Sequence, residues 1–480
     1  MTTPGSEAQA HILIFPYPAQ GHMISLLDLT HQLSLRGLTI TILVTPKNLP
    51  LLNPLLSKNP SIKTLVLPFP THPSIPHGLE NCKDLPPNSF AFMTAALGGL
   101  YEPLLNWFKT HPSPPVAIIS DMFLGWTHRL ACELNVRRFV FSPSGAMALS
   151  VGFSLWKDNP RRKNEDDRNE VISFPKIPNC PKYPWWQISP IYRRYVHGHP
   201  NGEFIRDIMV ANTESWGLVI NSFTELEASY LDHLREKMGQ DRVWAVGPLL
   251  PPRSKDDVSG PSERGGSSSA PVQELMAWLD SCEDHSVVYV CFGSQALLTS
   301  DQIEAVASGL DQSGIRFIWA TKEPANAQVD GRYGTLPIEF EQKVAGRGII
   351  VRGWAPQVMI LGHRAVGSFL THCGWNSVLE GLVAGVPMLA WPMGADQFVD
   401  ADLLDELKVG ERVCEGAGTV PNSTELARAV RESVSDNEDR RKRAKEISRA
   451  AVDAIKDDGS SATDLDGLVT HLGGLALKSM

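Results

Sequence analysis

Short apolar runs alternate with longer segments of mixed polarity along most of this chain. Such runs, rich in Val, Ile, Leu and Phe, predict strands that are buried on both faces, as in a parallel sheet covered by helices on each side. In the first half of the chain the runs are His11–Phe15, Leu38–Thr45, Ile62–Leu67, Val116–Ile119, Arg138–Phe141 and Leu218–Asn221.

A polar segment interrupts this pattern near the middle of the chain. Residues 251–270 (PPRSKDDVSGPSERGGSSSA) are rich in Pro, Gly, Ser and charge, which predicts a flexible linker. Strand–helix alternation on both sides of one linker predicts an α/β protein with two doubly wound, Rossmann-like domains, 1–250 and 271–460, facing a ligand-binding cleft. The apolar runs of the second half are Ser286–Phe292, Arg316–Ala320, Gly348–Val351, Gly367–Thr371 and Pro387–Trp391.

Composition narrows the function classes. The chain has 480 residues, 42% of them hydrophobic and 20% charged, which is typical of a globular enzyme. Its net charge of −9 disfavours a nucleic-acid partner. No apolar run approaches the length of a membrane span or of a targeting peptide, and the seven scattered cysteines form no CxxC pair. We therefore expect a cytoplasmic protein with reduced thiols.

The most specific pattern lies in the stretch 354–397. The apolar run Val366–Thr371 breaks at His372-Cys-Gly374 into a segment of helical character. Because a helix N-terminus presents unpaired N–H groups and a positive dipole end, this strand–Gly–helix order predicts a phosphate site. Asn376 and Ser377 lie where that helix should begin. Glu380 follows about one helical turn later, where its carboxylate suits a ribose diol. The spacing therefore predicts a nucleotide-diphosphate site.

This stretch resembles the signature box of plant secondary-product glycosyltransferases, the family-1 enzymes that use uridine-diphosphate sugars. The resemblance implies the two-domain architecture called GT-B, whose last helix crosses back onto the first domain. Here that helix would be Leu465–Leu477, within a terminal segment 461–480. The matching residues are Trp354-Ala-Pro-Gln357, His363, Thr371-His-Cys-Gly-Trp-Asn-Ser377, Glu380 and Asp396-Gln397.

The box residues have expected roles in binding the donor. Trp354 offers a flat face for uracil, Gln357 and Glu380 suit the ribose, and His372 lies beside the diphosphate. Taken singly, Trp354 could instead be core packing and Asn376 a helix cap. In the resembled family a closing Gln goes most often with glucose. The full predicted donor set is Ser294, Trp354, Ala355, Gln357, His372, Gly374, Trp375, Asn376, Ser377, Glu380, Asp396 and Gln397.

Two residues of the first half are candidates for catalysis. His22 follows the first apolar run and Asp121 follows the run Val116–Ser120, so both should emerge at the carboxyl edge of the sheet. A neutral imidazole can take a proton from a hydroxyl, and a carboxylate on its far nitrogen fixes the tautomer. The alternatives are a loop or helix-capping role for His22, and an N-cap of a helix over 123–134 for Asp121. The resemblance places both residues at the family's catalytic dyad.

One departure from the family lies beside His22. The family usually reads Gly-His-x-x-Pro, whereas this chain has Gly21-His-Met-Ile-Ser25. Proline in a first helical turn presets φ, and serine lacks that rigidity. We therefore expect the His22 loop to be less stiff than in the family.

The resulting hypothesis is an inverting transferase that moves glucose from UDP-glucose, as co-substrate, to a hydroxyl or carboxylate of a small apolar acceptor such as a flavonoid, phenolic or terpenoid. We expect a monomer that needs no cofactor and no metal, since the chain lacks an Asp-x-Asp motif. A nicotinamide-dependent oxidoreductase is disfavoured because neither domain starts with Gly-x-Gly-x-x-Gly. A non-catalytic sugar-nucleotide-binding protein is the alternative. The candidate acceptor residues are Phe90, Phe123, Phe141, Trp185 and Trp186.

Overall fold

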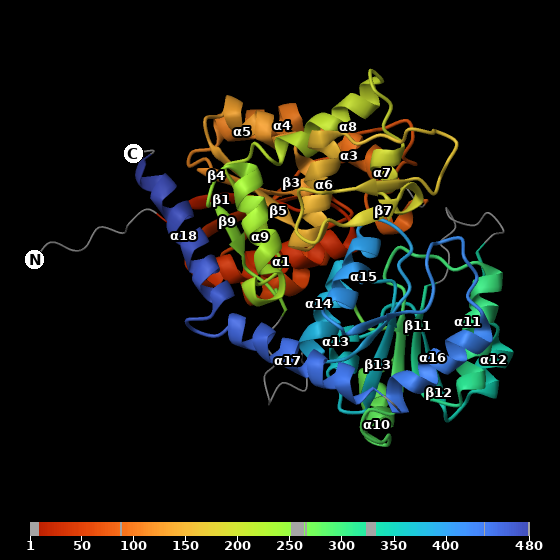
Figure 1. Cartoon of the computed structure of the whole chain (residues 1–480). Helices are drawn as coiled ribbons and strands as arrows, with labels where there is room; N and C mark the ends of the chain where they lie inside the picture. Colours follow the sequence, from red (N-terminus) through yellow and green to blue (C-terminus); the bar gives the residue numbers. More distant parts are fainter. Residues whose placement is uncertain are drawn as a thin grey trace, which may run out of the picture. The chain divides into compact units, whose positions relative to one another are not determined.

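A computed structural model of the chain describes residues 9–86, 89–250, 264, 266–322, 333–435 and 437–478. These residues form two compact units, each built around a parallel sheet (Figure 1). The first unit takes its described residues from 1–186, 191–250 and 454–480, and the second from 187–190 and 251–453. Of the predicted linker 251–270, residues 251–263 and 265 lie outside the described residues.

The first unit contains a seven-stranded parallel sheet in the order β3-β2-β1-β4-β5-β8-β9. The strand order reverses between β1 and β4, and ligands of doubly wound sheets bind at such a switch point. A separate antiparallel pair joins β6 (Val171–Ser173) to β7 (Lys182–Pro184). The strands of the main sheet are β1 (His11–Phe15), β2 (Thr39–Val44), β3 (Lys63–Val66), β4 (Ala117–Asp121), β5 (Arg137–Ser142), β8 (Gly217–Ile220) and β9 (Val243–Ala245).

Both faces of this sheet are covered because the side chains of each strand alternate between them. Ile12 and Ile14 of β1 belong to one apolar cluster, and Leu13 and Phe15 belong to another. The helices of the unit are α1 (Gln20–Leu35), α2 (Asn53–Lys58), α3 (Phe90–Gly98), α4 (Tyr101–Thr110), α5 (Thr127–Glu133), α6 (Ala146–Asp158), α7 (Pro190–Arg193), α8 (Pro200–Ala211), α9 (Thr224–Met238) and α18 (Ser460–Lys478), with 3-10 turns η1 (Leu49–Leu52), η2 (Cys82–Asp84), η3 (Met122–Leu124) and η4 (Trp185–Gln187).

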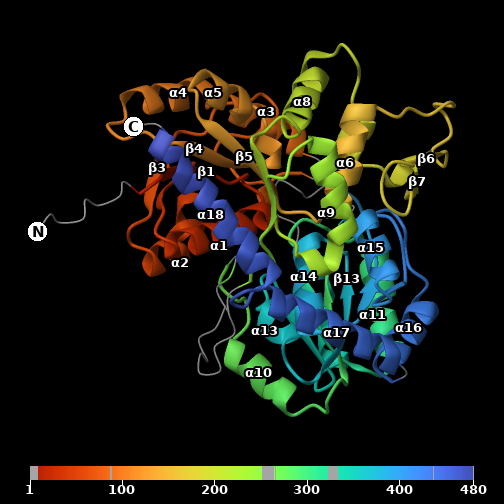
Figure 2. The same ribbon diagram turned by 60° about the vertical axis from the view of Figure 1, so that its left-hand side comes forward.

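The terminal helix α18 completes the first unit. Leu465, Leu468 and Leu472 are buried in the same cluster as Ile12 and Ile14 of β1. Figures 1 and 2 show α18, in dark blue, lying beside the red and green elements of this unit. Polar contacts fix it as well, since the Asp464 carboxylate accepts a hydrogen bond from the Ala245 N–H at 2.7 Å. The expected return of the last helix to the first domain is therefore observed.

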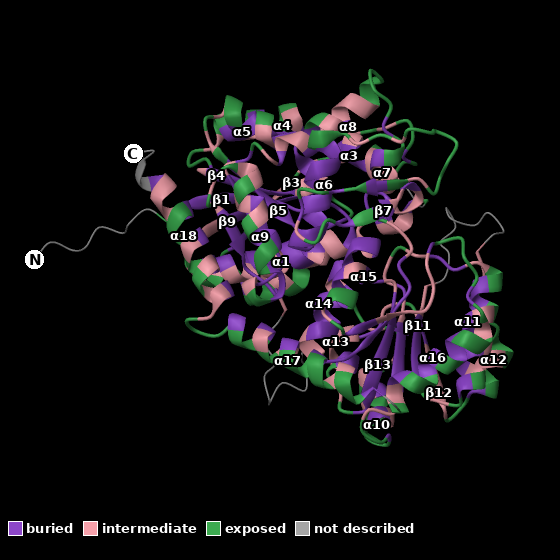
Figure 3. Ribbon diagram, viewed as in Figure 1, coloured by how far each residue is buried: buried purple, intermediate pink, exposed green. Residues whose placement is uncertain are grey.

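The second unit contains a six-stranded parallel sheet in the order β12-β11-β10-β13-β14-β15, which reverses between β10 and β13. Figure 3 shows its central strands buried among partly exposed helices, whereas the edge strands β12 and β15 are mostly half-buried. The elements are β10 (Val287–Cys291), β11 (Arg316–Thr321), β12 (Gly348–Arg352), β13 (Val366–Thr371), β14 (Met388–Ala390) and β15 (Gly410–Arg412), with α10 (Val272–Asp280), α11 (Ser300–Ser313), α12 (Ile338–Lys343), α13 (Gln357–Leu361), α14 (Trp375–Ala384), α15 (Gln397–Glu406), α16 (Ser423–Ser435) and α17 (Glu438–Ala454).

The predicted α/β class with two Rossmann-like domains is confirmed, whereas two local predictions are wrong and some short strands were missed. The strand β3 is mostly exposed, because it lies at the sheet edge where one side has no neighbour. The short strands β6, β7, β9 and β15 were not predicted, since none of them stands out as an apolar run in the sequence. The helix expected over 123–134 is divided into η3 and α5.

The described residues were also searched for membrane-spanning helices. Among them, no helix is both long enough and apolar enough to cross a membrane.

Candidate active site

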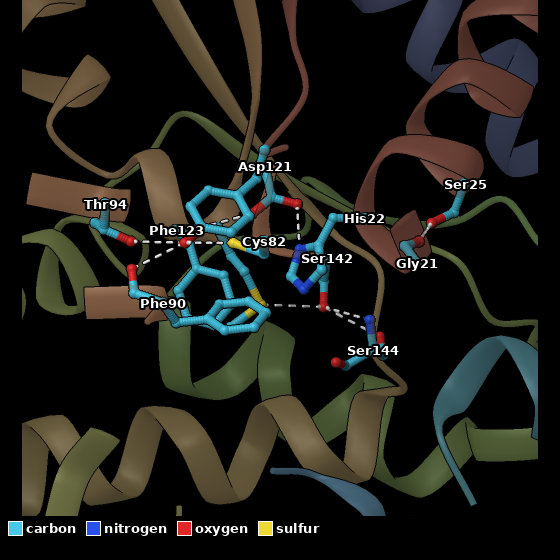
Figure 4. Close-up of polar contacts among 12 residues, drawn as sticks. Gly21, His22, Ser25, Cys82, Phe90, Thr94, Asp121, Phe123, Ser142 and Ser144 are labelled. Carbon is cyan, nitrogen blue, oxygen red and sulfur yellow. Dashed lines mark hydrogen bonds and ion pairs between the residues drawn. The ribbon is translucent and has the colours of Figure 1, made fainter. Parts of the chain in front are cut away.

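The first unit brings His22 and Asp121 into contact. His22 lies in the first turn of α1, directly after β1, and Asp121 is the last residue of the neighbouring strand β4. The His22 Nδ1 lies 2.8 Å from Asp121 Oδ2. Figure 4 shows the ring aimed at the carboxylate, with its other nitrogen pointing away. This geometry allows Asp121 to hold the proton on Nδ1 and leaves the Nε2 lone pair available as a base.

Asp121 makes the contacts that both interpretations of the sequence require. Its Oδ1 accepts a hydrogen bond from the Phe123 N–H at 2.9 Å and so caps η3, while Oδ2 contacts His22. The side chain is fully buried, whereas 16% of the His22 side chain is exposed. The carboxylate is therefore held by the fold, and the imidazole is the partner that a ligand can reach.

Ser25, where the family usually has proline, lies in the second turn of α1. It is fully buried, and its hydroxyl donates a 2.7 Å hydrogen bond to the Gly21 carbonyl (Figure 4). This bond joins Ser25 to the residue before His22. Position 25 therefore lies outside the first helical turn, in which proline would preset φ without losing a hydrogen bond.

Aromatic side chains surround the His22 ring. Its centroid lies 5.1 Å from Phe123, 5.9 Å from Phe90 and 5.5 Å from Tyr17. Tyr17 was not predicted, although its place in the loop after the first strand was a usable signal. Its hydroxyl donates to the Phe90 carbonyl at 2.9 Å, and burial raises its pKa well above the usual range. Tyr17 is therefore a neutral side chain that packs the wall beside the imidazole.

The other three acceptor candidates do not join this group. Phe141 is fully buried within the core cluster that includes β1 and α18, so it is not available to line an acceptor pocket and that prediction is wrong. Trp185 is buried against Tyr192, with the Arg162 guanidinium 4.7 Å from its ring. Trp186 is half-buried beside the same loop. Within the described part of the chain, the rings in contact with His22 are Tyr17, Phe90 and Phe123.

The predicted phosphate site of the second unit has the expected backbone. Strand β13 ends at Thr371, and α14 begins at Trp375 with Gly374 as its N-cap. Cys373 turns the chain between them with φ of 65°, a conformation that costs energy for a residue with a side chain. Asn376 is inside the first turn of α14, and no side chain caps this helix, so the capping alternative for Asn376 is wrong.

His372 lies in a narrow space between two glycines. A Cβ on Gly293 would be 2.5 Å from its Nε2, and one on Gly374 would be 2.6 Å away. Burial lowers the pKa of His372 to about 4, so the ring is neutral at pH 7 and can offer a hydrogen bond but no charge. Its Nδ1 is buried and has no hydrogen-bond partner among the described residues.

The two residues predicted for the ribose, Gln357 and Glu380, are already joined to each other, and Gln357 also contacts Ser377, which was predicted to lie beside the diphosphate. Gln357, the first residue of α13, donates from Nε2 to Ser377 Oγ at 3.1 Å and to Glu380 Oε2 at 2.6 Å. The other oxygen of Glu380 pairs with Arg264. Both side chains of this ion pair are less than one-tenth exposed. Arg264 belongs to the segment predicted as a linker, and nothing in its sequence context predicted this contact.

The chain around Gly266 and Ser269 lies against Trp354. The Ser269 N–H donates to the Trp354 carbonyl at 2.8 Å, and the Trp354 N–H donates to Ser269 Oγ at 2.9 Å. A Cβ on Gly266 would lie 3.5 Å from the indole. Trp354 is half-buried, so it is not a core residue, whereas Ala355 is buried.

The closing residues of the box occupy the start of α15. Gln397 Oε1 accepts hydrogen bonds from the Met393 and Gly394 N–H groups at 2.9 and 3.0 Å, which leaves its NH₂ group to donate elsewhere. Asp396 precedes it as the N-cap residue. Trp375 is buried, and Ser294 is half-buried directly after Gly293. The described residues contain no cluster of three or more His, Cys, Asp or Glu side chains that could hold a metal ion.

These observations define a class of protein before any comparison. Each unit is a doubly wound sheet with its candidate residues at the switch point, one with a His–Asp pair and one with a phosphate-binding turn. This is the organisation of a GT-B glycosyltransferase.

Comparison with known proteins identifies the family. Residues 266–453 match the family described as UDP-glucoronosyl and UDP-glucosyl transferase. The chain is 58% identical to UDP-glycosyltransferase 89B2 of Stevia rebaudiana, covering 97% of this chain and 98% of the relative. It is 57% identical to flavonol 3-O-glucosyltransferase UGT89B1 of Arabidopsis thaliana, covering 98% of each. The chain belongs to the plant family-1 UDP-glycosyltransferases.

A solved structure supports the same assignment. Arabidopsis thaliana UGT89C1, in complex with UDP-L-rhamnose, matches with a TM-score of 0.79 and 40% identity, covering 97% of this chain and 99% of that one. The protein is therefore a UDP-glycosyltransferase enzyme with the GT-B fold. This excludes the alternative of a non-catalytic binding protein of the same fold.

Proposed function

We propose that the protein transfers glucose from UDP-glucose to a hydroxyl group of a flavonol-like acceptor, with inversion at the anomeric carbon. The observation that carries this proposal is the His22–Asp121 pair within a group of aromatic rings. His22 is the general base and Asp121 orients it. The protein acts without a metal ion or an added cofactor.

The reaction follows from the free nitrogen of His22. Nε2 takes the proton of the acceptor hydroxyl while the oxygen forms a bond to sugar C1. The bond between C1 and the β-phosphate oxygen breaks through an oxocarbenium-like transition state, and UDP leaves with that electron pair. The Asp121 carboxylate stabilises the imidazolium that forms. Attack on the face opposite to the leaving group inverts the configuration.

The leaving diphosphate gains negative charge, and the β13–α14 turn is suited to receive it. The N-terminal N–H groups of α14 carry the positive end of the helix dipole, and Asn376 adds a polar group in its first turn. Ser294 directly follows Gly293, which lies against His372. His372 contributes as a neutral hydrogen-bonding group, because burial keeps its pKa near 4. These donors act through hydrogen bonds and the dipole.

The acceptor class rests on the rings beside His22 and on the relatives. Phe90 and Phe123, which are half-buried, provide flat apolar surfaces at the imidazole where an aromatic acceptor can stack, and the buried Tyr17 packs behind them. The 57% identical UGT89B1 is named a flavonol 3-O-glucosyltransferase, and UGT89C1 has been solved in complex with quercetin. A planar phenolic acceptor such as a flavonol is consistent with both.

Glucose is preferred as the donor sugar because Gln397 closes the box and presents its NH₂ group. The neighbouring carbonyl oxygen is held by two backbone N–H groups, which fixes the direction of that donor. UDP-L-rhamnose is the competing donor, since UGT89C1 was solved with it.

The test is a turnover assay with quercetin and kaempferol as acceptors and EDTA present. UDP-glucose and UDP-rhamnose are compared, using wild type and the His22→Ala variant. We expect a β-glucoside from UDP-glucose with wild type and its loss in the variant. Faster transfer of rhamnose would overturn the donor assignment, and undiminished activity of His22→Ala would overturn the mechanism. Loss of activity with EDTA would overturn metal independence.

A further inference from the structure

A buried arginine lies directly behind the catalytic pair. Arg138 is the second residue of β5, beside β4, and is 1% exposed. Phe139 and Phe141 on either side of Val140 point into the core cluster, so Arg138 belongs to the opposite face of the sheet. Arginine is seldom fully buried unless it is paired, and this one therefore requires an explanation.

The hydrogen bonds of Arg138 converge on the end of β4. Its Nε donates to Ser120 Oγ at 2.9 Å, and one terminal nitrogen donates to the Asp121 carbonyl at 3.3 Å. Although Arg138 pairs in register with Ile118, its side chain extends along the sheet to residues 120 and 121. The guanidinium thus holds the backbone from which the Asp121 carboxylate projects.

The other terminal nitrogen connects this strand to the end of α8. It donates to Asn212 Oδ1 at 3.0 Å and to Ser215 Oγ at 2.7 Å. Asn212 in turn donates to the Met122 carbonyl at 2.9 Å. Residues 120, 121 and 122 are therefore each bonded to one buried network centred on the guanidinium. The polar side chains of this network are at most 2% exposed.

The charge of Arg138 is not balanced by a direct ion pair. Among the described residues, no carboxylate is close enough to form one with this guanidinium, and its four hydrogen-bond acceptors are neutral. Burial lowers the pKa of Arg138 to about 9, and the negative charge of Asp121 opposes that shift. The group is thus cationic at neutral pH, and the charge that compensates it is that of Asp121.

We propose that Arg138 is a positioning residue for the His22–Asp121 pair. It fixes the end of β4 so that the Asp121 carboxylate faces His22, and its positive charge stabilises that carboxylate in a site without solvent contact. Arg138 touches neither substrate, and its effect on the rate passes through Asp121. This inference rests on the proposed function of the pair.

The experiment is a double-mutant cycle in the flavonol glucosylation assay, combining Arg138→Gln with Asp121→Asn. Because Arg138 supports an orienting group, we expect about a 10- to 100-fold lower kcat in Arg138→Gln, with the KM of both substrates nearly unchanged. In the Asp121→Asn background the same change should cost less than about twofold. Arg138→Lys, which keeps the charge, should recover part of the loss.

Arg137→Gln is the matched control. Arg137 is the adjacent residue of β5, but it is exposed and stacks 4.3 Å above the Trp216 ring. Its substitution should leave kcat within about twofold of wild type. If Arg138→Gln is insoluble, Ser215→Ala removes one hydrogen bond to the guanidinium and leaves the charge. It should lower kcat a few-fold in the wild-type background and not in Asp121→Asn.

Two results would overturn the proposal. One is an unchanged kcat in folded Arg138→Gln or Ser215→Ala. The other is an equal fold-loss in both backgrounds, which would show an effect independent of Asp121. Failure of the proposed function is a separate outcome. In that case His22→Ala and Asp121→Asn would keep wild-type activity, independent of the result for Arg138→Gln.

Discussion

The two switch points of this molecule differ in how their polar groups are satisfied. At the first, between β1 and β4, Asp121 is fully bonded and His22 keeps one ring nitrogen free of hydrogen bonds within the described residues. At the second, between β10 and β13, the Glu380 carboxylate is bonded on one oxygen by Gln357 and on the other by Arg264. The proposed base thus has a nitrogen available for a substrate, while the predicted ribose acid already has partners.

This difference follows from what each group has to do. A general base works best when its orientation is fixed before the substrate arrives, because less rearrangement is then needed in the transition state. A carboxylate that binds ribose hydroxyls can be satisfied by another group until the nucleotide displaces it. We therefore expect substitutions in the first site to change kcat and substitutions in the second to change donor affinity.

The largest effect is expected for His22→Ala. Removing the base should lower kcat by roughly 10³- to 10⁴-fold with little change in the Kd of UDP. Initial rates and calorimetric titration measure the two quantities. His31→Ala is the control, since His31 lies on the same helix and bonds to Asn59. A large loss of UDP affinity in His22→Ala would contradict the expectation that the first site controls kcat and the second site controls donor affinity.

A smaller loss is expected for Asp121→Asn. The amide keeps the shape but cannot stabilise the imidazolium, so kcat should fall roughly 10²- to 10³-fold. Because Oδ1 also caps η3, a melting curve is needed alongside the rates. If the activity falls only because less of the variant is folded, Asp121 has the structural role alone.

The donor site is tested by Glu380→Gln. Losing a charged hydrogen-bond acceptor for the ribose should weaken UDP binding by about 10- to 100-fold, with a smaller change in kcat at saturating donor. Glu432→Gln, on the exposed face of α16, is the control. Unchanged affinity would remove Glu380 from the nucleotide site.

Arg264→Ala also tests the donor site, but here we expect UDP to bind more tightly. If the nucleotide must displace this guanidinium, the variant should bind UDP about 3- to 10-fold more tightly, because one Glu380 oxygen is freed in advance. Arg428→Ala, whose partners are Glu425 and Glu432 on α16, controls for the loss of positive charge. Weaker binding in Arg264→Ala would show that the arginine contacts the donor.

The smallest effect concerns pH and His372. Its folded pKa is about 4 while an unfolded histidine has a pKa near 6.5, so the unfolded chain takes up a proton between these values and the folded one does not. The associated stability is complete above pH 6.5 and is lost as the pH falls toward 4, by at most about 3 kcal/mol.

Melting curves of wild type and His372→Gln between pH 6.5 and 4.5 test this sign. Other histidines, including the buried His11 and the half-buried His285, also have lowered pKa values and contribute to the slope. The difference between the two proteins isolates His372. A steeper fall in the variant would contradict a neutral, buried imidazole.

Much of this protein follows from its sequence. The apolar runs predict the central strands of both sheets because buried parallel strands need continuous Val, Ile, Leu and Phe. The stretch 354–397 predicts the strand, turn and helix of the phosphate site, since a short local motif determines that backbone. His22 and Asp121 could be paired in advance because parallel strands present their carboxyl ends at one edge.

Other features were decided by the tertiary structure. Phe141 reads as an acceptor residue in the sequence, yet its place in the alternation of β5 turns it into the core. The contacts of Arg264 with Glu380 and of Arg138 with Asn212 join residues far apart in the chain. Local patterns determine which elements form and which edge a residue approaches. Which distant side chain pairs with a buried charged group depends on how the elements pack. This pairing is therefore determined only in the tertiary structure.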